Sequence, residues 1–523
     1  MERKVHPESS VQVSQQSSIL LTKVGSAPYL FGVVDEIRNL LPSIRLLGIE
    51  STEDSVGHLF DEAVARTDQL LLGSYVKVPE ECRFLPPQVF RKFEQDIGLL
   101  LRLADRVFAH DLGDLTNDLG CNKKPEDSFG FRMQLVMRHA VYWNFVLTTR
   151  NVKAVVFPNL PHGMWDAVLL SLAKARDVPY MFFHEVPPFR GTLYLYNDSE
   201  RIGNFEFGRR TLAAAEKRYG LINSSDAREY VLLDQARMMP SKYDSGVLEV
   251  QRSKFDQLTK LMTGKRPVSS VFHSIRRRQL AATALRAEHS VYSMKNLNDG
   301  FYFLELQLPG NATTLVKGRE YPNQIDIIRF VASSLPSASE LVIRESPRFH
   351  ERRLARPSGF WPEISRIPKV RVVGANLSLD EISRRAAVVV ELSYSSLALK
   401  HLLSGKPVVF LSNTHLGRMP NMFRLEDFSS LSNALRSAGE SAVVEDDQVI
   451  LREVGRHVGD LLEATIETAL SWYPKPVLRD PEYGDRLTRN VARVIATWFL
   501  SMRFDESLTT NEKAQVHGQL GDN

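Results

Sequence analysis

Two adjacent serines, Ser395 and Ser396, join an apolar run typical of a buried strand (388–392) to a run with helical spacing (397–403). The first turn of a helix has free N–H groups and a positive dipole end, so it attracts anions, and hydroxyl groups there add donors. This pattern predicts a phosphate-binding site. The alternative is that one serine only caps the helix. Gly405 is expected to end that helix.

Further polar residues follow two other apolar segments that resemble strands. Arg344 and Glu345 come at the end of one, where an arginine can pair with phosphate and a carboxylate can accept hydrogen bonds from ribose. A surface ion pair is the alternative. Gln307, Thr313 and Thr314 lie around a loop after the other. Their neutral donors and acceptors suit a hydroxyl-rich ligand, and they equally suit an ordinary turn.

Candidates for proton transfer lie in the first half of the chain. The ranges 154–157 and 178–183 are expected to be strands, with a helix over 166–175 between them. Ligands of such a unit bind at the carboxyl ends of the strands. A general base is therefore sought among four residues on the two loops, namely His162, Asp166, His184 and Glu185. His162 is the first choice, and a purely structural role is the alternative for a histidine in such a loop.

These segments belong to a pattern in which short apolar runs alternate with longer amphipathic stretches. That alternation predicts an α/β fold with parallel sheets covered on both faces. A chain of 523 residues exceeds the usual domain size of about 100–200 residues, so two domains are expected. The expected divisions are a flexible arm (1–20), a first Rossmann-like domain (21–225), a helical linker (226–298), a second Rossmann-like domain (299–480), a C-terminal helix (481–505) and a flexible tail (506–523).

Composition narrows the function classes. The net charge is +4, from 66 basic and 62 acidic residues, which does not favour a nucleic-acid partner. Two cysteines in a chain of this size are typical of a cytosolic protein and exclude a thiolate zinc site. Because the N-terminal residues are polar, we expect no signal peptide, and no apolar stretch approaches the roughly 18 residues of a membrane span. Arg276–Arg278 are interpreted as a solvated helix face, with a membrane-surface patch as the alternative.

Four segments together resemble the capsule polysaccharide biosynthesis proteins, which are related to capsular Kdo transferases. They are 306–336, 341–347 and 389–411 in the second half, and 157–183 in the first. The resemblance implies a GT-B-like fold, in which two Rossmann-like domains face each other across a cleft and the C-terminal one holds most of the nucleotide.

The resemblance also implies site residues. The Ser-Ser or Ser-Thr pair of the family matches Ser395 and Ser396. Its Gln-Pro element is only approximated by Gln307 and Pro309, because Leu308 lies between them. Where the family pattern has Lys-Glu-His-Pro, this chain has Arg-Glu-Ser-Pro at 344–347. The donor nucleotide therefore stays open, with CMP as one candidate.

The implied function is a bacterial glycosyltransferase of capsular or other surface polysaccharide biosynthesis. Its partners would be a nucleotide sugar, a glycan acceptor and a polysaccharide assembly or export complex, with no separate cofactor and no metal. It would act in the cytoplasm, with peripheral contact at the cytoplasmic face of the inner membrane. The alternatives are a polyol-phosphate transferase or nucleotide-sugar epimerase on the same fold, or a catalytically silent scaffold of the assembly complex.

Overall fold

The structure is a computed structural model, and it describes residues 14, 16–22, 27–50, 59–66, 70, 78–106, 129–161, 164–185, 192–197, 206–219, 286, 288, 299–307, 323–346, 349, 356, 359–374, 379–392, 395–412, 421–425, 430–441, 465–467 and 481–502.

The first half contains strands β1 (Ser18–Leu21), β2 (Arg45–Glu50), β3 (Glu62–Arg66), β4 (Val152–Phe157), β5 (Tyr180–Glu185) and β6 (Thr192–Tyr196). Its helices are α1 (Ala27–Leu40), α3 (Pro87–Phe93), α4 (Ile97–Arg106), α5 (Phe129–Thr149), α6 (Met164–Ala175) and α7 (Glu206–Tyr219), with short 3-10 turns η2 (Glu80–Cys82) and η3 (Glu94–Asp96). The second half contains β7 (Tyr302–Glu305), α11 (Gln324–Ser334), β8 (Leu341–Arg344), α13 (Phe360–Ile364), β9 (Val370–Val373), α14 (Leu379–Arg385), β10 (Val388–Glu391), α15 (Ser396–Leu403), β11 (Val408–Phe410), β12 (Met422–Arg424) and α16 (Leu431–Glu440). The chain continues with β13 (Thr465–Glu467) and α18 (Pro481–Ser501).

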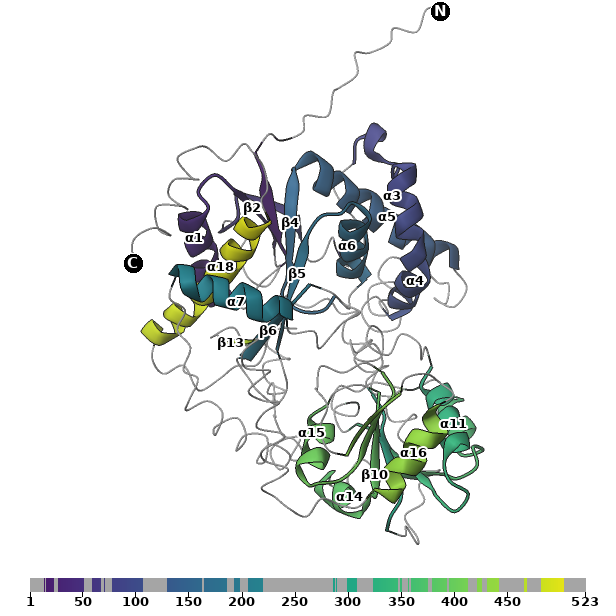
Figure 1. Ribbon diagram of the computed structural model, residues 1–523. Coiled ribbons are helices and arrows are strands. Elements are labelled where there is room, and N and C mark those ends of the chain that lie inside the picture. The colour runs from purple at the N-terminus through teal and green to yellow at the C-terminus, as the bar shows by residue number, and fades with distance from the viewer. Residues whose placement is uncertain are drawn as a thin grey trace, which may run out of the picture.

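Each half is built around its own sheet (Figure 1). The first sheet has seven strands in the order β13-β6-β5-β4-β1-β2-β3, and the second has six in the order β12-β11-β10-β7-β8-β9. Neighbouring strands of the second sheet all run parallel, and in the first sheet the antiparallel pairs are β5 with β6 and β6 with β13. The predicted fold class, a GT-B-like pair of Rossmann-like α/β domains, is confirmed. The predicted cleft between the halves stays a prediction.

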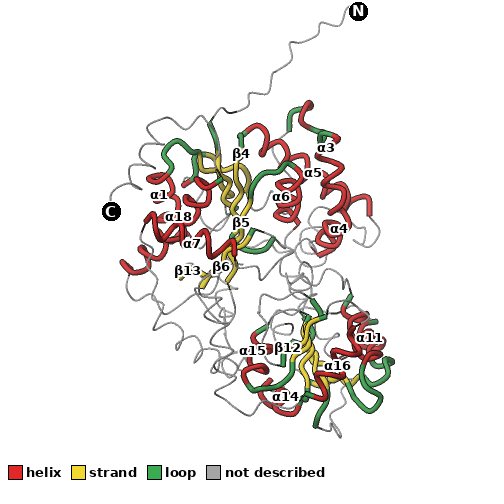
Figure 2. Tube along the Cα trace, viewed as in Figure 1, coloured by secondary structure: helices red, strands yellow, loops and turns green. Residues whose placement is uncertain are grey.

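In the first half, alternate side chains of each strand enter apolar layers on opposite faces of the sheet. Val155 and Phe182 pack with helices α3 to α6, whereas Val156 and Phe183 pack with α1, α7 and α18. Figure 2 shows helices on both sides of these strands. Because β4 is buried on both faces, its sequence is a nearly continuous apolar run, as expected for a central parallel strand.

The second half repeats this arrangement. Phe303 and Val389 pack toward α14 and α15, and Tyr302 and Val390 pack toward α11, α13 and α16. Helix α11 begins at Gln324, where the Oδ1 atom of Asn323 accepts the N–H of Ile325 at 3.0 Å and caps the helix.

The C-terminal part of the chain returns to the first half. Helix α18 lies beside α1 and α7, where the Nε atom of Arg493 bonds to Glu36 at 3.0 Å (Figure 1). Strand β13 pairs with β6, although it lies within the range 299–480 that was assigned to the second domain. The chain after the second sheet therefore contributes strand β13 and the long helix α18 to the first half.

Several sequence-based boundaries are wrong, since β4 begins at Val152 and α6 at Met164, each two residues before its expected start. The expected arm was to reach residue 20, but residues 18–20 belong to β1, which lies between β2 and β4. The strand expected over 178–183 covers Tyr180–Glu185, because its last residues pair with β6. The tail 506–523 and nearly all of the linker 226–298 lie outside the described residues.

Candidate functional site

Both sheets have the strand order of a doubly wound fold. Counted from the first strand of each half, both sheets run 3-2-1-4-5-6, and the first sheet has β13 as an additional edge strand beside β6. The direction of winding therefore reverses between β1 and β4 and between β7 and β10. Ligands of such sheets bind at the carboxyl edge at this switch point. The loops that flank the two switch points are the ones that carry most of the predicted site residues.

A row of charged side chains lies at the second switch point. Glu305 ends β7 and is paired in register with Arg344 of β8, while Glu391 ends β10 directly after the Val390–Leu304 pair. All three occupy the face that also carries Phe303 and Val389. The guanidinium of Arg344, which is fully buried, donates to Glu305 Oε1 at 2.7 Å. Arg344 therefore serves an internal ion pair rather than the surface pair considered as the alternative.

Glu391 is joined to the start of helix α15. The Oγ atom of Ser395 donates to Glu391 Oε1 at 2.7 Å and accepts the N–H of Ala398 at 3.0 Å. Ser395 thus caps α15, which was the alternative to phosphate binding for one serine. Burial, and secondarily the charge of Glu305, raise the pKa of Glu391 to about 8, against the lowering effect of the Ser395 bond. Ser396 is the first residue of α15.

The opposite face of the same sheet edge holds a second buried ion pair. Arg356 donates from Nε to Glu345 Oε2 at 2.7 Å and from its terminal nitrogen to Oε1 at 2.8 Å. Its guanidinium lies over the rings of Phe349 and Phe360, at 4.7 and 4.9 Å from their centroids. Burial raises the pKa of Glu345, and Arg356 opposes that shift. The carboxylate of Glu345 is thus bound on both oxygens by the protein.

Gln307 is fixed through its backbone. Its N–H donates to Gln324 Oε1 at 3.1 Å, and its carbonyl accepts from Gln324 Nε2 at 2.9 Å and from Arg356 at 3.0 Å. The end of β7 is therefore tied both to α11 and to the Arg356 side chain. Thr313 and Thr314 lie outside the described residues.

The candidates of the first half gather at its carboxyl edge. Asp166 lies, half-buried, in the first turn of α6, which follows the switch-point strand β4. His184 and Glu185, predicted on a loop, are instead the last residues of β5, next to β4. His162 lies outside the described residues.

Thr22 is a switch-point residue that the sequence analysis missed. It directly follows β1, and both its N–H and its hydroxyl donate to the Val156 carbonyl, at 3.0 and 3.1 Å. Glu305, Glu391 and Arg356 were missed as well. The sequence did contain a signal for the two glutamates, because each is a charged residue at the end of an apolar run.

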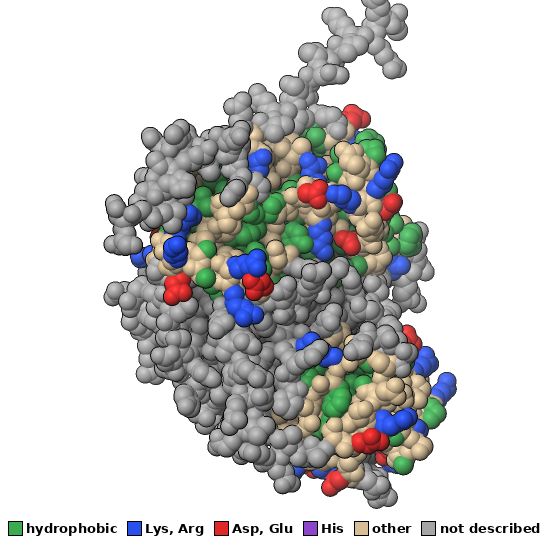
Figure 3. Space-filling view, in the orientation of Figure 1, with side chains coloured by type: hydrophobic (Ala, Val, Ile, Leu, Met, Phe, Trp, Pro, Cys, Tyr) green, Lys and Arg blue, Asp and Glu red, His purple; other side chains and the backbone are tan. Residues whose placement is uncertain are grey.

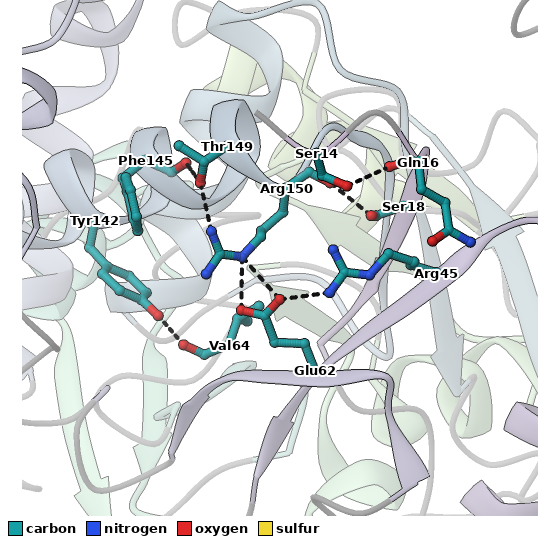
Figure 4. A network of polar contacts seen from close by, with 10 residues as sticks. All are labelled: Ser14, Gln16, Ser18, Arg45, Glu62, Val64, Tyr142, Phe145, Thr149 and Arg150. Carbon is teal, nitrogen blue, oxygen red and sulfur yellow. Dashed lines mark hydrogen bonds and ion pairs between the residues drawn. The ribbon is translucent and has the colours of Figure 1, made fainter. Parts of the chain in front are cut away.

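Figure 4 shows a polar network at the other edge of the first sheet. Arg45 and Glu62 are the first residues of β2 and β3, and Arg150 comes just before β4. Glu62 accepts from Arg45 at 2.9 Å and from Arg150 at 2.8 Å, while the Tyr142 hydroxyl donates to the carbonyl of Val64 (Figure 4). The ion pairs of Glu62 lie at the amino ends of the strands, away from the switch point, and they join β2 and β3 to the segment between α5 and β4.

Surface charge on the face drawn in Figure 3 and metal ligands in the described part of the chain do not single out another site. On the face drawn in Figure 3, basic and acidic side chains are interspersed. No group of three His, Cys, Asp or Glu side chains among the described residues could hold a metal ion. None of the helices that the structure describes has the length and apolar character of a membrane span.

Comparison with solved structures gives remote likenesses. No known protein family matches the chain, and no curated protein does either. The UDP-GlcNAc 2-epimerase from Methanocaldococcus jannaschii matches over 84% of this chain and 98% of its own, with 10% identity and a TM-score of 0.24. The α,α-trehalose-phosphate synthase (UDP-forming) from Burkholderia vietnamiensis matches over 92% and 99%, with 11% identity and a TM-score of 0.28. The HepE protein of Anabaena in complex with UDP-glucose matches over 93% and 99%, with 10% identity and a TM-score of 0.26. At these TM-scores, what establishes the fold is the sheet topology described above.

Proposed function

We propose that the protein is a glycosyltransferase that uses a nucleotide-activated sugar to build a capsular or other surface polysaccharide. The observation that carries this proposal is the position of the second switch point. It lies between β7 and β10. Gln307 comes two residues after the end of β7, and the Ser395–Ser396 pair lies where the segment after β10 meets α15. A doubly wound sheet binds a nucleotide at this point.

In this proposal the donor phosphate lies at the start of α15. The backbone N–H groups of the first turn and the hydroxyls of Ser395 and Ser396 hold the negative charge that grows on the leaving phosphate. Thr313 and Thr314 bind hydroxyl groups of the donor. Arg344 and Glu345 do not bind the donor in this proposal. Their ion pairs fix the ends of β7 and β8, and so hold the loops of the site in place.

The acceptor binds at the first switch point. A general base there takes the proton of the attacking hydroxyl while the sugar leaves its phosphate. Of the candidates His162, Asp166, His184 and Glu185, we propose His162, because an imidazole has a pKa near neutrality and its loop follows β4 at the switch point. A polysaccharide assembly complex at the cytoplasmic face of the inner membrane is the proposed setting.

A catalytically silent scaffold is the second candidate. It is favoured by the internal bonding of three predicted nucleotide ligands, since Ser395, Arg344 and Glu345 all bind protein groups. The two candidates differ in whether the protein binds a nucleotide at all.

The experiment is a thermal-shift screen with CMP, CDP, UDP, GDP and their sugar conjugates. A ligand that binds only the folded protein raises the melting temperature, by the equivalent of about 2.7 kcal/mol at a concentration of one hundred times Kd. We expect one nucleotide to raise it, and the double variant Ser395→Ala/Ser396→Ala to lose that shift. Ser333→Ala is the matched control, because the Ser333 hydroxyl is exposed at the end of α11. A flat response across the panel would support the scaffold instead.

A further inference from the structure

The hydroxyl of Ser395 has its full bonding capacity in use. A hydroxyl has one hydrogen to donate and two lone pairs to accept with. One lone pair accepts the N–H of Ala398, and the contact with Glu391 Oε1 measures 2.7 Å between heavy atoms. If Glu391 is ionised, the Ser395 hydrogen must point at that carboxylate and is not available to a ligand. If Glu391 is protonated, the same contact can run in the other direction.

The surroundings of Glu391 favour its protonated form. It is 1% exposed, and the neighbouring strand β7 places Glu305 beside it. The only guanidinium of this row, on Arg344 of β8, is bonded to Glu305. On α15, burial lowers the pKa of His401 to about 3, so its imidazole is neutral, and strand β11 contributes Phe410 in register. Glu391 thus has a carboxylate neighbour and no cation bonded to it among the described residues.

We propose that Glu391 is a positioning residue whose carboxyl proton sets the direction of the Ser395 hydroxyl, and so decides whether that hydroxyl can bind a phosphate group of the donor nucleotide. This inference rests on the proposed function, which places the phosphate at the start of α15. With the proton present, Glu391 donates to Ser395 Oγ, Ala398 donates to the same atom, and the Ser395 hydrogen points outward to a phosphate oxygen. With the proton lost, the hydrogen turns back to Glu391.

The predicted effect of pH follows from this arrangement. Loss of the proton removes one donor from the phosphate and adds a negative charge beside it, so both effects weaken binding. The apparent Kd is the intrinsic Kd divided by the binding-competent fraction. With the pKa of Glu391 raised to about 8, that fraction drops from about 0.9 at pH 7 to about 0.1 at pH 9, so Kd rises about tenfold.

The experiment measures Kd by calorimetry from pH 7 to pH 9 with the nucleotide that gives the largest thermal shift in the panel. We compare wild type, Glu391→Gln and Ser395→Ala. The carboxamide of Glu391→Gln donates to Ser395 at every pH and has the shape of the protonated acid. We expect wild-type Kd to rise about tenfold, Glu391→Gln to stay within about twofold, and Ser395→Ala to bind weakly throughout.

Each other result has a separate meaning. A wild-type Kd that is constant with pH overturns the inference even if Glu391→Gln does not fold. An equal rise in wild type and Glu391→Gln places the titrating group elsewhere and also overturns it, while the proposed function stands. Ser395→Ala binding as tightly as wild type refutes the phosphate role of Ser395, and a flat nucleotide panel refutes the proposed function itself; the inference fails with either.

Discussion

The ion pair between Arg356 and Glu345 gives the sharpest test of how the second half is held together. Arg356 is bonded to both carboxylate oxygens of Glu345 and to the carbonyl of Gln307, and its guanidinium lies over the rings of Phe349 and Phe360. The side chains of Arg356 and Glu345 are 4% and 0% exposed. The change Arg356→Met keeps much of the side chain's bulk and removes its charge and donors, which leaves Glu345 buried without this partner.

Removing one partner of a buried ion pair costs about 3–5 kcal/mol. Part of this loss is recovered where Glu345 takes up a proton. Burial already raises the pKa of Glu345, and the loss of Arg356 removes its main opposing influence. A carboxyl with a higher pKa in the folded protein than in the unfolded chain binds protons more strongly when folded. Stability therefore falls as pH rises between the unfolded and folded pKa values, by up to about 1.4 kcal/mol per pH unit.

Hydrogen exchange measured by mass spectrometry on peptides that cover β7 and β8 reports the local opening free energy. We expect Arg356→Met to lower it by about 3–5 kcal/mol at neutral pH and by less in mild acid. Adding Glu345→Gln should restore more than half of the loss. The control is Arg371→Met, because Arg371 and its partner Glu340 are each 33% exposed, and such pairs contribute about 1 kcal/mol or less. A loss no greater than in the control, or one independent of pH, would refute the reasoning.

Two further predictions concern stability. Glu62→Gln weakens the bonds to Arg45 and Arg150, which are partly exposed, so we expect a loss of about 1–2 kcal/mol in urea unfolding that shrinks in high salt; an equal loss at both salt concentrations would count against an electrostatic origin. Gly405, which ends α15 as predicted, has φ +70°, so Gly405→Ala should cost about 1 kcal/mol. At Gly98 in α4 an added Cβ atom would meet no other atom within 4 Å, so Gly98→Ala should stabilise the protein by about 0.5–1 kcal/mol. If the melting temperatures of Gly405→Ala and Gly98→Ala moved in the same direction, these two predictions would be contradicted.

Much of the fold could be predicted because buried parallel strands and capped helices leave local signals. Strand β4 is an apolar run, and α11 has its capping residue Asn323 directly before it. The elements that were missed depend on distant partners. Strand β13 has only three residues and exists because it pairs with β6, more than 250 residues earlier in the chain. Nothing local in its sequence indicates that pairing.

The candidate site was harder to predict because its side chains are bonded to residues far along the chain. Arg344 and Glu345 are adjacent, so at the end of a strand they point to opposite faces of the sheet and cannot act on one ligand group as a pair. Their partners, Glu305 and Arg356, lie 39 and 11 residues away. The strand pattern of the sequence predicts where the functional loops lie. The ion pairs next to these loops could be predicted only if the pairing register of the strands were known.

The charges at the second switch point give the strongest reason to test Glu391 first. Phosphate binding beside two carboxyl groups and one arginine is unfavourable if both carboxyl groups are ionised, because the row then has a net negative charge. Arg344 neutralises Glu305 directly. Glu391 has no such partner among the described residues, and a raised pKa allows it to be neutralised by a proton near neutral pH. With that proton the row is neutral overall and Ser395 regains a donor. Protonation of Glu391 is therefore the simplest way in which the sheet edge observed here can bind the phosphate that the serine pair predicts.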